Sequence, residues 1–287
     1  MTEKPKKKQS RFGETWRRLK KSKVAVVSLF VIIVIILIAL LAPVLAPYEP
    51  QKQDTARVLE LSSREHLLGT DRLGRDVLSR LIWGSRQSLQ MGFTAVILAA
   101  VMGILVGSIA GYYGGLTDTL IMRFLDIFQG IPMFLLTVTL AAVLGPSLRN
   151  AIIAIGVGMF PGNARFMRAC ILTVRETEYI DAARMINAND RRIIRKHIIP
   201  NAITPMIVSI TMGLGGSVLS GAGLSFIGLG VQPPIPEWGG MISDARNFMR
   251  GNPQLSLYPG LCIMITVLAF NLLGDGLRDA LDPRLKT

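Results

Sequence analysis

Histidine and cysteine are scarce in this chain of 287 residues, which has two of each. Cys170 and Cys262 both fall within apolar runs, where packing in a core explains them better than a disulfide or a metal site. His66 and His197 lie far apart in the sequence and lack the spacing of metal ligands, so we expect both to be structural.

Motifs of nucleotide hydrolysis and of hydrolytic enzymes are absent as well. No lysine follows a glycine, so the chain has no Walker A sequence and cannot itself supply the P-loop of an ATPase. Neither HExxH nor GxSxG occurs, and neither histidine lies in a long apolar run. The sequence therefore predicts no catalytic residue, no metal site and no cofactor in this chain.

Long apolar runs are what the sequence does have. Half of the residues are hydrophobic, and residues 24–45 contain no charged residue. About 20 apolar residues suffice for a helix to cross the roughly 30 Å hydrocarbon core of a bilayer, whereas a soluble helix shows one polar face. We predict an all-α polytopic membrane protein with six transmembrane helices, at 24–45, 89–110, 119–144, 151–171, 203–227 and 257–273.

Positive charge gathers at the N-terminus, where ten lysines and arginines precede residue 24. A basic tail can bind nucleic acid, but this one adjoins a membrane span, so the positive-inside rule explains it better. We therefore expect residues 1–23 to be a cytoplasmic tail in a bacterial inner membrane protein that contacts lipid and binds no nucleic acid. Six spans return the C-terminal tail, 276–287, to the cytoplasm, together with the basic loop 172–201.

The same topology places residues 46–88 outside, although this segment carries seven basic residues, which conflicts mildly with the rule. The sequence Gly69-Thr70-Asp71 predicts a turn and a helix cap. Apolar residues then recur at helical spacing from Val77 to Ile82 and predict an amphipathic helix. That helix either lies in the membrane interface or packs on the bundle.

Residues 89–275 form the predicted core of five helices. Gly103, Gly107 and Gly111 share the spacing that lets two helices approach closely in lipid, although glycines can also supply hinges. Arg123 and Asp126 lie three residues apart near the start of the third span. An ion pair within the helix explains them best, and a gate or a subunit interface is the alternative.

The most informative stretch is residues 178–201, which is polar and lies in the basic loop. Its first part is strongly helical in propensity, and Asn187 then interrupts the pattern. Asn189 or Asp190 can cap a second helix, which Pro200 is expected to end. The sequence therefore predicts two short helices that meet at a turn and project from the membrane.

This stretch resembles the cytoplasmic EAA loop of permease subunits of binding-protein-dependent ABC importers. Asp181-Ala182-Ala183 corresponds to the E-A-A sequence, and 198–201 corresponds loosely to its distal end. Asn187 stands where the family has glycine, and asparagine tolerates a left-handed turn best after glycine. Residues 66–80, 225–239 and 271–284 are similar to the oligopeptide, dipeptide and nickel subfamily, in particular to the C-type permease of the pair.

The resemblance implies a second permease subunit in a heterodimer, two ATPase subunits that use ATP and magnesium, and an extracytoplasmic solute-binding protein. It implies di- or oligopeptides as substrates, with nickel as the alternative. A loop that merely rests on lipid headgroups is the simpler interpretation of the EAA-like stretch. The residues expected to couple the chain to an ATPase are Glu178, Tyr179, Asp181, Ala182, Ala183, Arg184 and Asn187.

Two other classes of protein compete with this interpretation. A secondary transporter or channel would place ionisable groups at the middle of its spans, and four of the six predicted spans have none there. A membrane-embedded enzyme would need a nucleophile with its base or a pair of acids in the bundle, and the sequence shows neither.

Overall fold

A computed structural model describes residues 11–281, so the first ten residues of the N-terminal basic tail and the last six residues of the chain lie outside the described part. The described residues are mainly helical and form no β-strand; one isolated bridge joins Thr70 to Asp76. The predicted all-α class is confirmed.

The first apolar run forms α2 (Lys23–Leu40) and the short α3 (Ala42–Leu45), preceded by α1 (Arg11–Leu19). Ser22 caps α2, because its hydroxyl accepts a hydrogen bond from the Ala25 N–H at 3.3 Å. α2 packs along α12 (Gln254–Leu281), and α1 contacts the far end of the same helix.

The second run is part of α4 (Val77–Tyr113), a single helix of 37 residues. The predicted amphipathic helix is the first part of α4. Of the two alternatives, a helix that lies in the membrane interface is therefore wrong, and a helix that packs on the bundle is confirmed. Val77 and Leu81 are buried against Trp238 and Met241. The cap is Asp76 and not Asp71, because the Asp76 carboxylate accepts from the Ser79 N–H at 2.7 Å.

The third apolar run forms two helices at an angle and not one continuous helix. α5 (Gly115–Gln129) and α6 (Met133–Leu144) meet at an angle of 82°, where one continuous span was predicted. Pro132 precedes α6, and it has no N–H to continue the hydrogen bonds of α5. α5 begins at Gly114 and Gly115, which both have positive φ angles.

α7 (Leu148–Arg175) lies closely against α4. A Cβ atom on Gly107 would lie 2.8 Å from the Cβ of Met167 and closer still to the Ala164 carbonyl oxygen. Cβ atoms on Gly103 and Gly111 would also meet α7 at less than 3 Å. Close helix approach at these three glycines is therefore confirmed.

Four helices among residues 11–281 are long and apolar enough to cross a membrane, namely α2, α4, the continuous helix Asp190–Phe226 and α12. The bent α5–α6 pair is a fifth if it counts as one span. α7, the predicted fourth span, carries four arginines and is not among them. The chain is a multi-pass membrane protein, and the number six stays a prediction.

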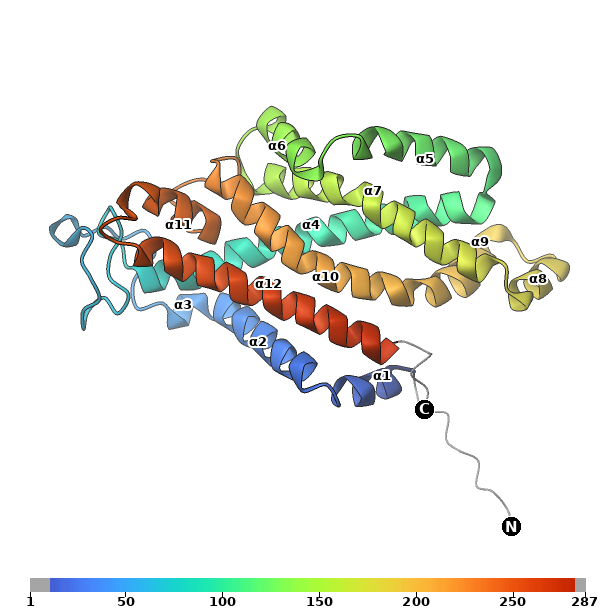
Figure 1. The fold of residues 1–287 in the computed structure, drawn as a ribbon, viewed down its shortest axis with the longest axis horizontal. Coiled ribbons are helices and arrows are strands. Elements are labelled where there is room, and N and C mark those ends of the chain that lie inside the picture. Colours follow the sequence, from blue (N-terminus) through green and yellow to red (C-terminus); the bar gives the residue numbers. More distant parts are fainter. Residues whose placement is uncertain (1–10, 282–287) are drawn as a thin grey trace, which may run out of the picture.

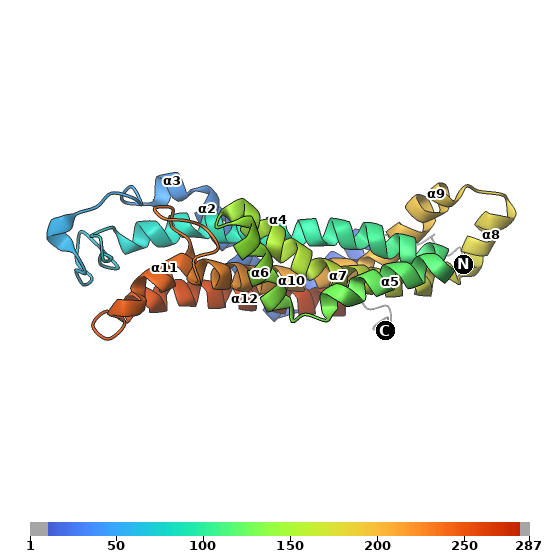
Figure 2. The same cartoon turned by 90° about the horizontal axis from the view of Figure 1, so that it is seen from above.

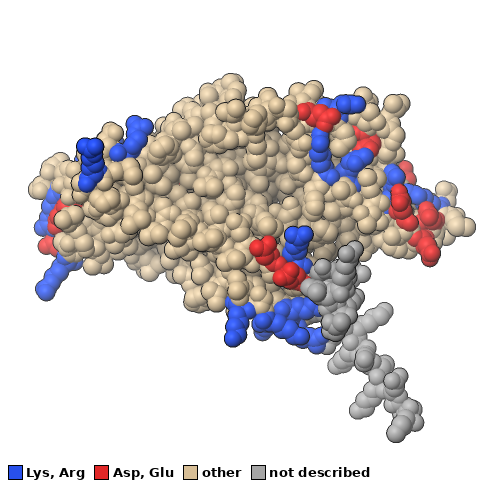
Figure 3. All heavy atoms as spheres, in the orientation of Figure 1, with Lys and Arg blue, Asp and Glu red and all other residues tan. Residues whose placement is uncertain are grey.

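The long helices run back and forth along one axis of the molecule (Figure 1). The loops 46–76 and α11 (Trp238–Ala245) lie at one end, which we call the α11 end; α8 (Glu178–Met185) and α9 (Asp190–Ile193) lie at the other, the α8 end (Figures 1 and 2). On the face in Figure 3, charged side chains gather at both ends and along the lower edge, and the broad surface between them is uncharged, as a membrane span requires.

Candidate functional site

The EAA-like stretch folds as a hairpin of α8 and α9, which we call the α8–α9 hairpin (residues 178–193). The first predicted short helix is confirmed as α8, and a second helix begins after the turn as predicted, but it is not short. After α9 the chain does not end its helix at Pro200. It continues through a π-helical turn at Ile194–Ile198 into α10 (Ile199–Phe226), and this local change of hydrogen-bond pattern directly before Pro200 accommodates the missing N–H of the proline within the continuous helix.

Asn187 forms the turn of the hairpin. Its φ of 56° confirms the predicted left-handed conformation. The Asn187 N–H donates to the Arg184 carbonyl at 2.9 Å, and the Ala188 N–H donates to the Ala183 carbonyl at 3.2 Å. These two bonds make a Schellman motif, which ends α8 and fixes the direction of the chain. Of the two predicted caps for α9, the structure selects Asn189, whose side chain accepts from the Arg191 N–H at 3.0 Å.

α8 has one face toward the bundle and one toward solvent. Ile180 and Ala183 are buried and pack with Met167, Ile171 and Ile198. Ala183 therefore lies on the inner face of the hairpin, and its expected coupling role stays a prediction. The other expected coupling residues are exposed; they are Glu178, Tyr179, Asp181, Ala182, Arg184 and Asn187.

Tyr112, at the end of α4, fastens the hairpin to the long helices. Its hydroxyl donates to the Asp190 carboxylate at 2.6 Å, and the Arg184 guanidinium lies 6.0 Å from the centre of its ring. Arg184 also pairs with Asp181 at 3.1 Å within α8. Sequence analysis missed Tyr112, because only the fold brings the end of α4 beside residue 190.

Arg175 adds a second connection between α7 and the end of α4. Its guanidinium donates to the carbonyls of Gly111 and Tyr112 at 3.1 and 3.4 Å. A cation at this position also compensates the negative end of the α4 dipole. These contacts attach the hairpin to α4, α7 and α10. Displacing the hairpin therefore requires these helices to move with it.

Arg123 and Asp126 differ in how closely they form ion pairs. Arg123 lies 3.8 Å from Asp126, and its side chain is 80% exposed, so the expected ion pair within the helix is weak. Asp126 instead pairs closely with Arg165 of α7. About two turns of α5 earlier in the chain, Asp118 pairs through both carboxylate oxygens with Arg168. Two Asp–Arg pairs therefore hold α5 against α7, and sequence analysis had not connected these residues.

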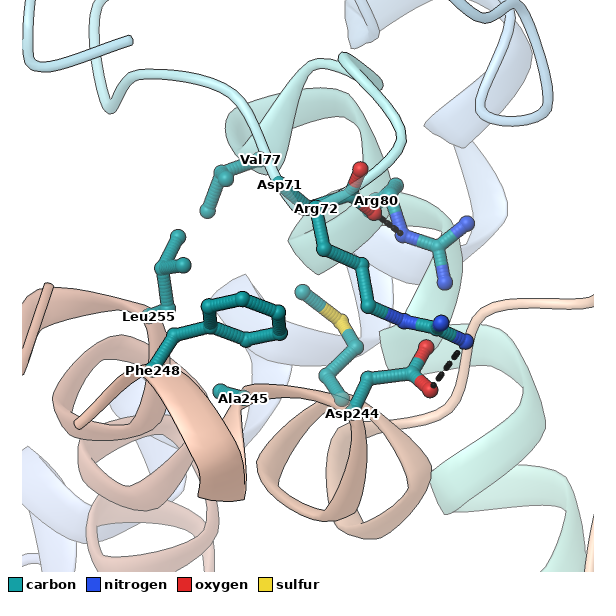
Figure 4. Close-up of a pocket in the computed structure, with 9 residues that line it drawn as sticks. Asp71, Arg72, Val77, Arg80, Asp244, Ala245, Phe248 and Leu255 are labelled. Carbon is teal, nitrogen blue, oxygen red and sulfur yellow. Dashed lines mark hydrogen bonds and ion pairs between the residues drawn. The ribbon is translucent and has the colours of Figure 1, made fainter. Parts of the chain in front are cut away.

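The α11 end holds a second polar cluster, of which Figure 4 shows Asp71, Arg72, Arg80 and Asp244. Asp71 pairs with Arg75 at 2.6 Å and with Arg80 at 3.4 Å, and Asp244 of α11 pairs with Arg72 at 3.2 Å. The Arg75 and Arg80 side chains are almost fully buried. The cluster joins the loop before α4 to α11, beside a cavity of only about 20 Å³, which is too small for a solute.

Basic side chains elsewhere in the segment 46–88 also lie beside carboxylates. Arg57 lies against Glu65, whose carboxylate raises the pKa of the Arg57 guanidinium, and His66 bonds to Asp76 at 2.9 Å in a buried position. The structural role expected for His66 is confirmed. Both cysteines are free, and among residues 11–281 no group of three His, Cys, Asp or Glu side chains could hold a metal ion.

Comparison with known proteins gives a consistent result. Residues 103–287 match the family described as binding-protein-dependent transport system inner membrane component. Residues 10–61 match the N-terminal TM domain of oligopeptide transport permease C.

Relatives match nearly the whole chain. A dipeptide transport system permease protein of Alkalihalophilus pseudofirmus is 46% identical over 97% of this chain and 91% of its own length. One from Haemophilus influenzae is 42% identical over 95% of each chain. A glutathione transport system permease protein of Pectobacterium atrosepticum is 41% identical over 96% of this chain and 91% of its own.

The fold itself resembles solved transporter chains. A chain of a methionine ABC transporter in an inward-facing conformation aligns with a TM-score of 0.57 at 24% identity, over 71% of this chain and 97% of its own. A chain of an amino acid ABC transporter aligns with a TM-score of 0.54 at 16% identity, over 69% and 92%.

Proposed function

Since the chain belongs to the family of binding-protein-dependent transport system inner membrane components, we propose that it forms half of the translocation pathway of an ATP-driven importer and couples that pathway to ATPases through the α8–α9 hairpin. The supporting observation is the hairpin itself. Its inner face is anchored by Ile180 and Ala183, while Asp181, Ala182 and Arg184 remain exposed.

The partners follow from the family. The chain has no Walker A sequence, so ATP and magnesium bind to separate ATPase subunits, and a solute-binding protein delivers the substrate from outside. A second permease subunit completes the pathway as a heterodimer. The α8 end then faces the cytoplasm and the α11 end faces outward, with both chain termini inside.

Short peptides are the proposed substrates. Relatives of 41–46% identity are dipeptide and glutathione transport system permeases, and glutathione is itself a small peptide. Nickel is the alternative. A deletion strain without redundant peptide importers should resist toxic dipeptides and keep normal nickel-dependent enzyme activity; the reverse pattern would assign the chain to nickel.

Ala182→Trp tests the docking role, because Ala182 is exposed on α8. A bulky ring there should abolish uptake and co-purification with the ATPases, while membrane insertion and thermal stability stay unchanged. The matched control is Ala56→Trp, which places the same ring on an exposed alanine at the α11 end. Normal uptake by Ala182→Trp would refute the docking role. Ala183→Trp is unsuitable, because it would overfill the core beneath the hairpin.

A further inference from the structure

A groove between α2 and α4 combines an apolar lining with two polar side chains. Its volume is about 400 Å³, and it is open on one side. One end of its lining is polar and the remainder is apolar. The lining residues are Ile36, Ala39, Leu40, Arg86, Leu89, Gln90 and Phe93.

The depth of the groove in the membrane follows from the sequence of α4. Residues 89–110 carry no charge, so the hydrocarbon region begins at about Leu89. Arg86 lies three residues before that run, and Trp83 lies one turn earlier still, where aromatic residues mark the membrane interface. The polar end of the groove is therefore at the level of lipid headgroups, and the apolar part is at the level of acyl chains.

Arg86 differs from the three arginines that precede it most closely in the sequence. Arg72, Arg75 and Arg80 each pair with a carboxylate, whereas no carboxylate of residues 11–281 lies within 4.0 Å of Arg86. Its guanidinium lies 5.4 Å from the centre of the Trp83 ring, which helps to hold it in place. Gln90 follows at i+4 on the same face of the helix and offers an amide donor beside it.

From these observations we propose that the α2–α4 groove is a binding site for one phospholipid. The phosphate accepts hydrogen bonds from the Arg86 guanidinium, whose fork matches two phosphate oxygens, and from the Gln90 amide. One acyl chain lies against Leu40, Leu89 and Phe93. The lipid belongs to the leaflet at the α11 end and fills the groove between α2 and α4, so it supports the packing of the first span.

Photolabelling tests the site. The permease, assembled with its partner subunits in nanodiscs, is exposed to phosphatidylglycerol with a diazirine in its acyl chain, and the labelled residues are mapped by mass spectrometry. We expect labels concentrated at Leu40 and Phe93. Arg86→Gln should reduce them about tenfold, the effect of one lost charge-assisted hydrogen bond. The matched control is Arg64→Gln, an exposed arginine outside the groove, which should leave labelling unchanged.

Two results would overturn the proposal. Labelling of Arg86→Gln at the wild-type level would show that the arginine holds no phosphate, and labels spread equally over exposed apolar residues of α5, such as Leu116 and Ile127, would show general lipid contact only. Cysteines placed at Leu40 that cross-link to the second permease subunit would assign the groove to a subunit interface. Native mass spectrometry of the same complexes should show one retained phospholipid fewer for Arg86→Gln.

Discussion

Gly107 is a position where a single methyl group has no room. A Cβ atom there would lie 2.8 Å from Met167 and 3.0 Å from the backbone nitrogen of Arg168, so α4 and α7 would have to separate. Gly107→Ala should therefore lower the free energy of unfolding by about 1–3 kcal/mol, the usual cost of overpacking. Thermal unfolding of the purified protein measures the change.

Gly216 provides the matched control for this substitution. It also lies inside a long helix, but a Cβ atom added to it would meet nothing within 4 Å. Gly216→Ala should leave the protein as stable or raise its stability by up to about 1 kcal/mol, because alanine favours the helix. Equal destabilisation by both substitutions would contradict close packing at Gly107.

Asn187 tests the turn of the hairpin. Glycine has no steric cost at its φ of 56°, so Asn187→Gly should retain uptake. Valine resists the left-handed conformation by about 1–3 kcal/mol, so Asn187→Val should distort the hairpin and reduce both stability and uptake. Uptake assays and thermal unfolding of the two variants decide the matter; wild-type behaviour of the valine variant would argue against a strained turn.

Local sequence signals were sufficient for some residues and insufficient for others. The turn at Asn187 and the cap at Asn189 were predictable, because the residues that form them are neighbours in sequence. The bond from Tyr112 to Asp190 joins residues 78 positions apart, so no local pattern reveals it. Likewise, Ala183 has the same propensity as Ala182, and only tertiary packing decides which of them is buried.

At the scale of the helices, the attachment of α5 to α7 depends on polar pairs as well as packing. Asp118 binds both the Nε and a terminal nitrogen of Arg168, and both side chains are largely shielded from solvent. We expect Arg168→Gln and Asp118→Asn each to cost on the order of 1–3 kcal/mol, since each leaves the other charge without its partner.

A double-mutant cycle measures this pair. The double variant should cost less than the two single variants together, because it leaves no unpaired charge. Arg123→Gln is the control on the same helix; its side chain is 80% exposed and should contribute less than about 1 kcal/mol. Strict additivity of the two single effects would show that Asp118 and Arg168 act independently.

Helices were predictable where apolar runs have clear ends, and less so where the fold decides their course. The long α4 joins a polar amphipathic part to an apolar part, and the change of composition at Ser88 suggested two helices where the structure has one. The bend between α5 and α6 has a local signal in Gly130 and Pro132, but residues 119–144 are apolar almost throughout, which concealed it.

At the scale of the whole molecule, both ends carry positive charge, and ion pairs with carboxylates are more frequent at the α11 end. At the α8 end, four exposed basic residues have no carboxylate within 4.0 Å among residues 11–281; they are Arg191, Arg192, Arg195 and Lys196. At the α11 end, four arginines are each paired with carboxylates; they are Arg57, Arg72, Arg75 and Arg80. Lys52, Arg64 and Arg86 of the outer segment have no carboxylate within 4.0 Å among residues 11–281, and the positive-inside rule counts lysines and arginines whether or not they are paired, so the mild conflict with that rule remains.

Thiol labelling in intact cells tests the proposed orientation. In a background without Cys170 and Cys262, a cysteine at Gln53 should react with a membrane-impermeant maleimide, because Gln53 is exposed at the α11 end. A cysteine at Met185, whose side chain is 88% exposed on the hairpin, should react only after the membrane is permeabilised. Permeabilisation serves as the control for reactivity. Labelling of Met185→Cys in intact cells would place the hairpin outside, where no ATPase could reach it, and would refute both the orientation and the coupling role.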